Sequence, residues 1–323
     1  MMNIRTDLAR EAYEMLMEAS HEISGITTKE ESYDDIAICR VNIETNEAAE
    51  KMGKGVGSYI TIDIPDTTVM DKDKRQQICR LLAKEIKSLT KLSDDASVLI
   101  VGLGNRFVTP DALGPEVVSS LVVTRHIFEY LPEHTAEGMR PVCAISPGVL
   151  GITGMETGEI VRGITDKIKP DLIICIDALA SRSTERISRT IQLSDTGIAP
   201  GAGVGNKRHA LNKETLGVPV IAIGVPTVID AATITSDSLA AVTESIKKVR
   251  GEDDGLYKLL SSIDENDRTT LVKDALMPDS GNFMVTPKEI DMVIEKVAKL
   301  VADGINLSLH ENFDFEDIEA YVS

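Results

Sequence analysis

Two acidic residues stand just after apolar runs that predict buried strands. Asp177 follows Leu172–Ile176, and Asp111 lies in a short loop after Val98–Leu103. If these runs are neighbouring strands of a parallel sheet, both carboxylates project into one crevice at the carboxyl edge, where ligands bind. Two acids at close range cannot both ionise cheaply, so one keeps its proton while the other accepts a proton from water. Such a pair could polarise a peptide carbonyl and activate water without a metal or a covalent nucleophile.

Each acid also has a purely structural interpretation. Asp177 could cap a helical turn over the Ala178-Leu179-Ala180 that follows it, because a short acidic side chain accepts the first free N–H groups of a helix. Asp111 follows Pro110 and could serve only as a turn residue. Taken singly, neither acid decides between these alternatives.

Two glycine-rich stretches accompany the acids. In the first, Gly102-Leu103-Gly104 lacks the third glycine of a dinucleotide fingerprint, since Phe107 stands at that position. Dinucleotide binding is therefore disfavoured. The second stretch, Ile198–His209, has flexible backbone and basic side chains. It could bind a carboxylate, line a substrate channel or form only a mobile surface loop, and these alternatives stay open.

Other kinds of catalytic centre have little support. No two histidines or cysteines have the close spacing of a zinc site. No Gly-x-Ser-x-Gly motif is present, and no cysteine has an obvious basic partner, so a serine or cysteine nucleophile is disfavoured. Three of the four cysteines, Cys39, Cys143 and Cys175, lie in or beside apolar runs and are expected to act as small hydrophobic residues.

The elements that must position the acids alternate along the chain. Short β-branched runs bounded by turn residues predict strands, and apolar residues at helical spacing predict helices. The predicted strands are Ile36–Ile43, Tyr59–Ile64, Val98–Leu103, Val142–Ile145, Leu172–Ile176 and Val218–Ile223. The predicted helices are Thr6–Ala19, Lys72–Leu92, Pro115–Tyr130, Glu156–Ile168, Ile229–Val249 and Pro287–Ala302.

This alternation predicts an α/β fold with a mostly parallel sheet and helices on both faces. The two strands before residue 93 lie close together in sequence and predict an antiparallel addition at the sheet edge. We expect one elaborated domain over 1–323, with a peripheral part at 1–92, a catalytic core at 93–250 and a second peripheral part at 251–323. No internal repeat or linker argues for a division.

Composition excludes several classes of protein. The 323 residues are 42% hydrophobic and 27% charged, which suits a globular core. The net charge is −18, aromatic residues make up only 3%, and Trp is absent, all of which oppose nucleic-acid binding. No apolar run approaches the ~20 residues of a membrane helix, and the N-terminus lacks a secretory signal. We therefore expect a cytoplasmic protein with no membrane partner.

The motifs, taken in order, resemble the germination protease of spore-forming bacteria, an endopeptidase that degrades small acid-soluble spore proteins. The resemblance covers nearly the whole chain and lies in Ile4–Ala9, Gly102–Pro115, Ser146–Gly158, Lys169–Arg182, Gly201–Arg208 and Gly217–Asp230. This family is similar in fold to the hydrogenase maturation endopeptidases, an α/β sandwich whose first strand also ends in a Gly-x-Gly-Asn turn.

The resemblance implies an atypical aspartic endopeptidase with Asp111 and Asp177 as its catalytic acids. It also implies a spore-protein substrate cleaved in the cytoplasm of the spore core, without a cofactor. We expect five residues of the matched loops to line the substrate cleft: Gly104, Asn105, Gly203, Asn206 and Arg208. The maturation enzymes bind nickel through acids at similar places and a histidine. No clear counterpart of that histidine is present here, and His209 alone lies near a matched loop.

The family further implies a homotetrameric zymogen that removes an N-terminal prosegment. Only Met1-Met2-Asn3 precedes Ile4 here, which predicts a minimal prosegment or a start placed elsewhere. Two other functions remain as alternatives: a metal-dependent peptidase of the maturation type, and a module that binds spore proteins without cutting them.

Overall fold

The structure is a computed structural model that describes residues 6–19, 24–199, 210–263 and 283–322, with a few positions in between. The strands are β1 (Ile26–Tyr33), β2 (Ile36–Ile43), β3 (Gly57–Asp63), β4 (Val98–Gly102), β5 (Val142–Ile145), β6 (Leu172–Ser181), β7 (Thr190–Ser194), β8 (Val220–Asp230) and β9 (Met284–Val285). The longer helices are α1 (Ala9–Ala19), α3 (Lys72–Leu89), α7 (Thr157–Ile168), α9 (Ala231–Arg250) and α12 (Ile290–Leu309). The shorter ones are α2 (Asn46–Met52), α4 (Leu113–Ser119), α5 (Arg125–Tyr130), α6 (Leu150–Thr153), α8 (Lys213–Leu216), α10 (Gly255–Ser261) and α13 (Phe315–Val322).

All the described strands join one mixed sheet in the order β1-β2-β3-β7-β8-β6-β4-β5, with β9 beside β8. The half formed by β8, β6, β4 and β5 is parallel. The other half, from β1 through β7, is antiparallel and joins β8 in the antiparallel sense. The α/β class and the antiparallel edge are confirmed. The sheet is less parallel than the sequence predicts, because β1 and β7 were not recognised as strands.

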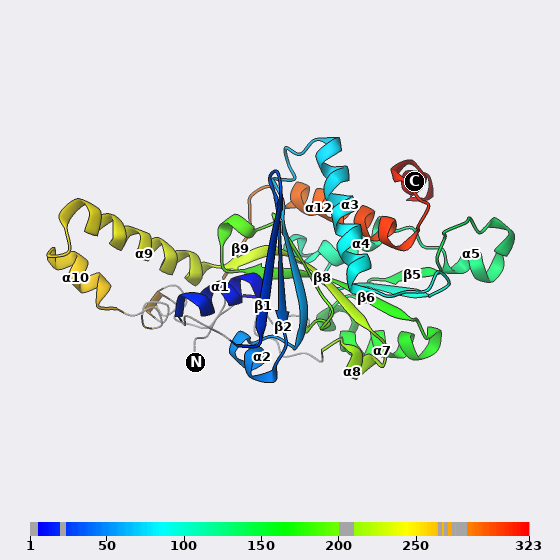
Figure 1. The fold of residues 1–323 in the computed structure, drawn as a ribbon, viewed down its shortest axis with the longest axis horizontal. Coiled ribbons are helices and arrows are strands. Elements are labelled where there is room, and N and C mark those ends of the chain that lie inside the picture. The colour runs from blue at the N-terminus through cyan, green and yellow to red at the C-terminus, as the bar shows by residue number, and fades with distance from the viewer. Residues whose placement is uncertain are drawn as a thin grey trace.

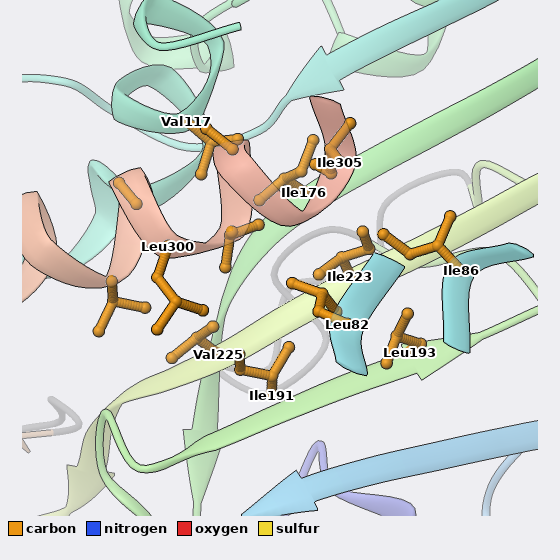
Figure 2. Packing of buried hydrophobic residues seen from close by; sticks show 14 of the residues in the cluster. Leu82, Ile86, Val117, Ile176, Ile191, Leu193, Ile223, Val225, Leu300 and Ile305 are labelled. Atoms are coloured by element: carbon orange, nitrogen blue, oxygen red, sulfur yellow. The ribbon is translucent and has the colours of Figure 1, made fainter. Parts of the chain in front are cut away.

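Helices cover both faces of the sheet, as predicted (Figure 1). On one face, α3, α4 and α12 pack over the central strands in the largest hydrophobic cluster. Figure 2 shows Leu82 and Ile86 of α3 and Leu300 of α12 directed toward the sheet residues Ile223 and Val225. On the other face, α7 and α8 cover β4 and β6, while α1 and α2 cover β2 and β3. β4 is buried along its whole length, as a strand covered on both faces must be.

Several predicted helix boundaries differ from the structure, and α12, for example, ends at Leu309 and not at Ala302. Two of the differences have a local explanation. The helix predicted over Pro115–Tyr130 is two short helices, α4 and α5, since three β-branched residues in a row, Val122, Val123 and Thr124, lie between them. There Val122 donates its N–H to the side chain of Asn306 instead of continuing a helix. The predicted helix from Ile229 begins two residues later, because β8 continues to Asp230, whose carboxylate caps α9 by accepting the N–H of Ala232.

A buried histidine ties the end of α12 to the body of the molecule. His310 is 1% exposed, and its Nδ1 accepts the N–H of Arg140 at 3.3 Å. Its Nε2–H therefore faces the Val122 carbonyl at 3.4 Å. Burial lowers the pKa of His310 to about 4, so the folded protein holds this ring neutral.

Within the described residues, no helix combines the length and the apolar character needed to cross a bilayer.

The lowered pKa of His310 predicts a loss of stability on mild acidification. Between pH 6.5 and about 4 the unfolded chain protonates this ring while the folded chain does not. The free energy of unfolding therefore falls with falling pH, by up to ~1.4 kcal/mol per pH unit from this group. Urea unfolding at pH 7 and pH 5 measures the slope, and His310→Phe, which removes the titrating group, should flatten it. An unchanged slope in His310→Phe would contradict the assignment.

Candidate active site

One candidate acid, Asp177, lies in β6, and the other, Asp111, lies in the loop that follows the adjacent parallel strand β4. β4 pairs with β6 over Val98–Gly102 and Leu172–Ile176, and the N–H of Leu103 continues this pairing by donating to the Ile176 carbonyl at 2.8 Å. Asp177 is the next residue of β6, and the chain that leaves β4 returns to the same place at Asp111. Both acids line one cavity of about 840 Å³. The juxtaposition predicted from the sequence is therefore present.

Asp111 is held in place by the loop that carries it. It ends a single 3-10 turn, Thr109–Asp111. The N–H of Asn105 donates both to the main-chain oxygen of Asp111 at 3.0 Å and to its carboxylate Oδ2 at 2.9 Å. From β8, the hydroxyl of Thr227 donates to the Pro110 carbonyl at 2.7 Å. Hydrogen bonds therefore hold the loop together internally and attach it to β8 of the sheet.

Glycines in this segment permit close backbone approach. Gly104 has φ +110°, and a Cβ there would overlap the main-chain oxygen of Asp111. Gly102 and Gly114 touch one another so closely that a Cβ on either would overlap the backbone of the facing segment. These contacts bring the start of α4 against the end of β4. The Gly102-Leu103-Gly104 pattern therefore has a packing role here, which agrees with the weak nucleotide fingerprint.

Asp177 lies inside a strand, which corrects the interpretation as a helix cap. β6 was expected to end at Ile176 but continues to Ser181, and no helix begins at Asp177. Its side chain is 7% exposed, and its Oδ1 accepts the N–H of Ala178 at 2.9 Å. β6 extends because β8 beside it is equally long, with Asp177 opposite Gly224. A buried acid in the middle of a strand has no capping role, so a functional role is favoured.

Four of the described residues that line the cavity can carry charge: Asp7, Lys54, Asp111 and Asp177. Sequence reasoning assigned no role to Asp7 or Lys54. Burial raises the pKa of Asp7 and lowers the pKa of Lys54, and each group partly offsets the shift of the other. Asp7 precedes α1 and Lys54 follows the glycine that ends α2, so neither stands at the end of a strand. No pattern in the sequence places these elements at the carboxyl edge of the sheet.

The remaining predicted cleft residues divide into two groups. Gly104 and Asn105 line the cavity. Gly203, Asn206 and Arg208 lie outside the described residues, as does His209. The described residues on either side of that segment, Ile198–Ala199 and Ala210, line the cavity as well.

The cysteines and metal-ligating side chains offer no second centre in the described part of the chain. All four cysteines are free thiols, and three of them are buried. Burial raises the pKa of Cys175, two residues before Asp177, so this thiol stays protonated and is a poor nucleophile. Among the described residues, no three His, Cys, Asp or Glu side chains group as metal ligands.

Comparison with known proteins gives a consistent result. A family model described as "Germination protease" matches residues 4–261 and 250–322. The germination protease of Clostridium tetani is 48% identical over 323 residues, covering 100% of both chains. That of Caldanaerobacter subterraneus is 49% identical over 308 residues, covering 95% of this chain and 94% of the relative. That of Bacillus mycoides is 45% identical over 356 residues, covering 99% and 97%.

A solved structure also matches. It is the NiFe hydrogenase maturation protease HycI from Thermococcus kodakarensis, with a TM-score of 0.34 and 18% identity over 68% of this chain and 98% of that one. The family match spans nearly the whole sequence, and the matching relatives align over almost their full lengths. This chain belongs to the germination protease family.

Proposed function

We propose that this protein is an endopeptidase that hydrolyses small acid-soluble spore proteins during germination, with Asp111 and Asp177 as an aspartic dyad. Membership of the germination protease family supports the general activity, a protease of spore germination. The observation that carries the dyad is that Asp177, in β6, and Asp111, in the loop after the adjoining strand β4, line one cavity. The same family and cavity support cleavage of a polypeptide.

The proposed reaction needs the two acids in opposite protonation states. The ionised carboxylate takes a proton from water as the water oxygen attacks the peptide carbonyl carbon. The protonated carboxyl donates its proton to the carbonyl oxygen, which forms a neutral tetrahedral intermediate. Collapse of this intermediate breaks the C–N bond: the carboxyl that took the proton from water gives it to the leaving nitrogen, and the other carboxylate takes a proton back from a hydroxyl of the intermediate. Two carboxyls that share one proton can repeat this cycle without a cofactor.

The hydrogen bonds around the two acids and the size of the cavity support this reaction. The Asn105 N–H on Asp111 and the Ala178 N–H on Asp177 each hold one carboxylate oxygen in place. A cavity of about 840 Å³ can hold several residues of an extended chain. The proposal includes Gly203, Asn206 and Arg208 as residues that contact the substrate.

The compartment, the oligomeric state and the partner of the enzyme form part of the same proposal. The substrate places the enzyme in the cytoplasm of the spore core, and the family resemblance favours a homotetramer made as a zymogen. The net charge of −18 opposes direct binding to the DNA of that compartment. The partner is therefore the spore protein itself rather than a nucleic acid or a membrane.

Incubation of the purified chain with a small acid-soluble spore protein tests the function. We expect discrete internal cuts, seen by mass spectrometry of the fragments, at a rate unaffected by a strong chelator. Activity that chelation abolishes and nickel or zinc restores would support a metal-dependent peptidase instead. An intact substrate held in a stoichiometric complex after long incubation would support a binding module. An unrelated unfolded protein serves as the control for cleavage without specificity.

A further inference from the structure

The segment that precedes α1 lies against the strand that carries Asp177. The N–H of Asp7 donates to the Ala180 carbonyl at 3.0 Å, and Oδ2 of Asp7 accepts the Ala180 N–H at 2.8 Å. Ala180 lies three residues beyond Asp177 on β6. Asp7 therefore binds both the N–H and the carbonyl of Ala180, as a residue of a neighbouring strand would.

This contact lies where the sheet supports β6 least. On one side, β4 ends at Gly102 and its last bond reaches Ile176, so β6 loses that neighbour just before Asp177. On the other side, the register with β8 shifts between Leu179 and Ala180. Strand backbone beside an irregular register and without a partner on one edge is free to shift. At this point Asp7 gives both backbone groups of Ala180 a hydrogen-bond partner.

The position of Asp7 is itself fixed from two other parts of the chain. Nζ of Lys54 donates to the carbonyls of Thr6 at 3.2 Å and Asp7 at 2.8 Å. The side chain of Gln192 in β7 accepts the Ala9 N–H at 2.6 Å and donates to the Asp7 carbonyl at 3.1 Å. Lys54 and Gln192 line the cavity together with Asp7. Burying the Lys54 ammonium and the Asp7 carboxylate costs free energy. Such a pair is therefore expected where it fixes the position of a segment of the chain.

We propose that Asp7 is a positioning residue of the reaction, which holds Ala180 and thereby sets the place of Asp177 in the cavity. This inference rests on the proposed function, because it takes Asp177 to be a catalytic acid. What Asp7 contributes is a hydrogen-bond acceptor at a fixed point. An asparagine can supply that acceptor through its amide oxygen, whereas an alanine cannot.

Three variants test the role: Asp7→Ala, Asp7→Asn and the matched control Asp171→Ala. Asp171 also accepts a backbone N–H, that of Ser97 at 2.7 Å, but at the opposite end of β6 from the cavity. We expect Asp7→Ala to lower kcat about tenfold to a hundredfold with little change in KM, since a small displacement of a catalytic group has this effect. Asp7→Asn should retain most of kcat, and Asp171→Ala should retain all of it.

A second readout separates this inference from the proposed function. Hydrogen exchange of the peptides covering β6 should be faster in Asp7→Ala than in the wild-type chain and unchanged in Asp7→Asn, whatever the substrate proves to be. Wild-type kcat or exchange in Asp7→Ala would overturn the inference, as would an Asp7→Asn as impaired as Asp7→Ala. If Asp7→Ala does not fold, Lys54→Met loosens Asp7 without altering it. Wild-type exchange and kcat in that variant would also overturn the inference.

Discussion

Asparagine in place of Asp177 should reduce the cleavage rate of a spore protein by about 10²- to 10⁴-fold, the usual contribution of a general acid or base. The substitution keeps the shape of the side chain and an oxygen that can accept the Ala178 N–H. The fold is therefore retained while the proton transfer is lost. Asp111→Asn should have a comparable effect, since the Asn105 N–H can bond to the amide oxygen in the same way. The measurement is kcat/KM on one spore-protein substrate.

The double variant makes this prediction sharper. If the two acids act as one unit, removing the second costs little once the first is gone. Asp111→Asn combined with Asp177→Asn should then be about as slow as either single variant. Losses that multiply would indicate two independent contributions, and full activity in either single variant would end the case for the dyad.

Asp230 provides the matched control. It is a buried acid, 6% exposed, at the end of β8, the strand next to β6. Its carboxylate caps α9, and asparagine is an equally good cap. Asp230→Asn should therefore retain wild-type kcat/KM. A loss similar to that of Asp177→Asn would mean that any buried acid at this edge of the sheet affects activity.

Much of the site could be predicted because it depends on rules local to the chain. An acid that directly follows an apolar run, or lies in the loop after one, marks the carboxyl edge of a buried strand, and two such acids in an α/β pattern predict a shared crevice. That reasoning led to Asp177 and Asp111, whereas Gly104 and Asn105 were expected from the family resemblance of their loop. The same rules gave the boundaries of β2 and β5 without error.

Two strands of the antiparallel half, β1 and β7, lie beyond those rules. β1 is a largely exposed edge strand with six consecutive polar residues, so no apolar alternation identifies it. β7 has only five residues, and it is a strand because β3 and β8 lie on either side of it. β6 continues past Asp177 for the same reason. Tertiary pairing, and not the local sequence, sets these boundaries.

Asp7 and Lys54 were missed for a related reason. Their place in the cavity depends on how α1 and α2 pack across β2 and β3, which no spacing in the sequence reveals. An acid three residues into a matched motif and a lysine between two glycines are ordinary surface patterns. Only the contacts of Lys54 with the Thr6 and Asp7 carbonyls distinguish it from such a surface residue.

Gly104→Ala should abolish most of the activity while leaving the core intact. At φ +110° an alanine is strained, and its Cβ would overlap the main-chain oxygen of Asp111. The loop must then move, and the Asn105 N–H that holds the Asp111 carboxylate moves with it. A displacement of about 1 Å at a catalytic group costs on the order of 10²-fold in rate. We expect that loss in kcat, together with a destabilisation of about 1–3 kcal/mol from the strained backbone.

Gly163→Ala is the control for this substitution. Gly163 lies on an exposed turn of α7, has no atom within 4 Å of the added Cβ and does not need a positive φ. Alanine there should raise stability by up to about 1 kcal/mol, since glycine weakens a helix by that amount. Activity should be unchanged. If Gly104→Ala cleaved substrate as fast as Gly163→Ala, the tight loop around Asp111 would not be what positions this acid. A loop that tolerates the extra methyl group without loss of activity does not hold the carboxylate in its catalytic place.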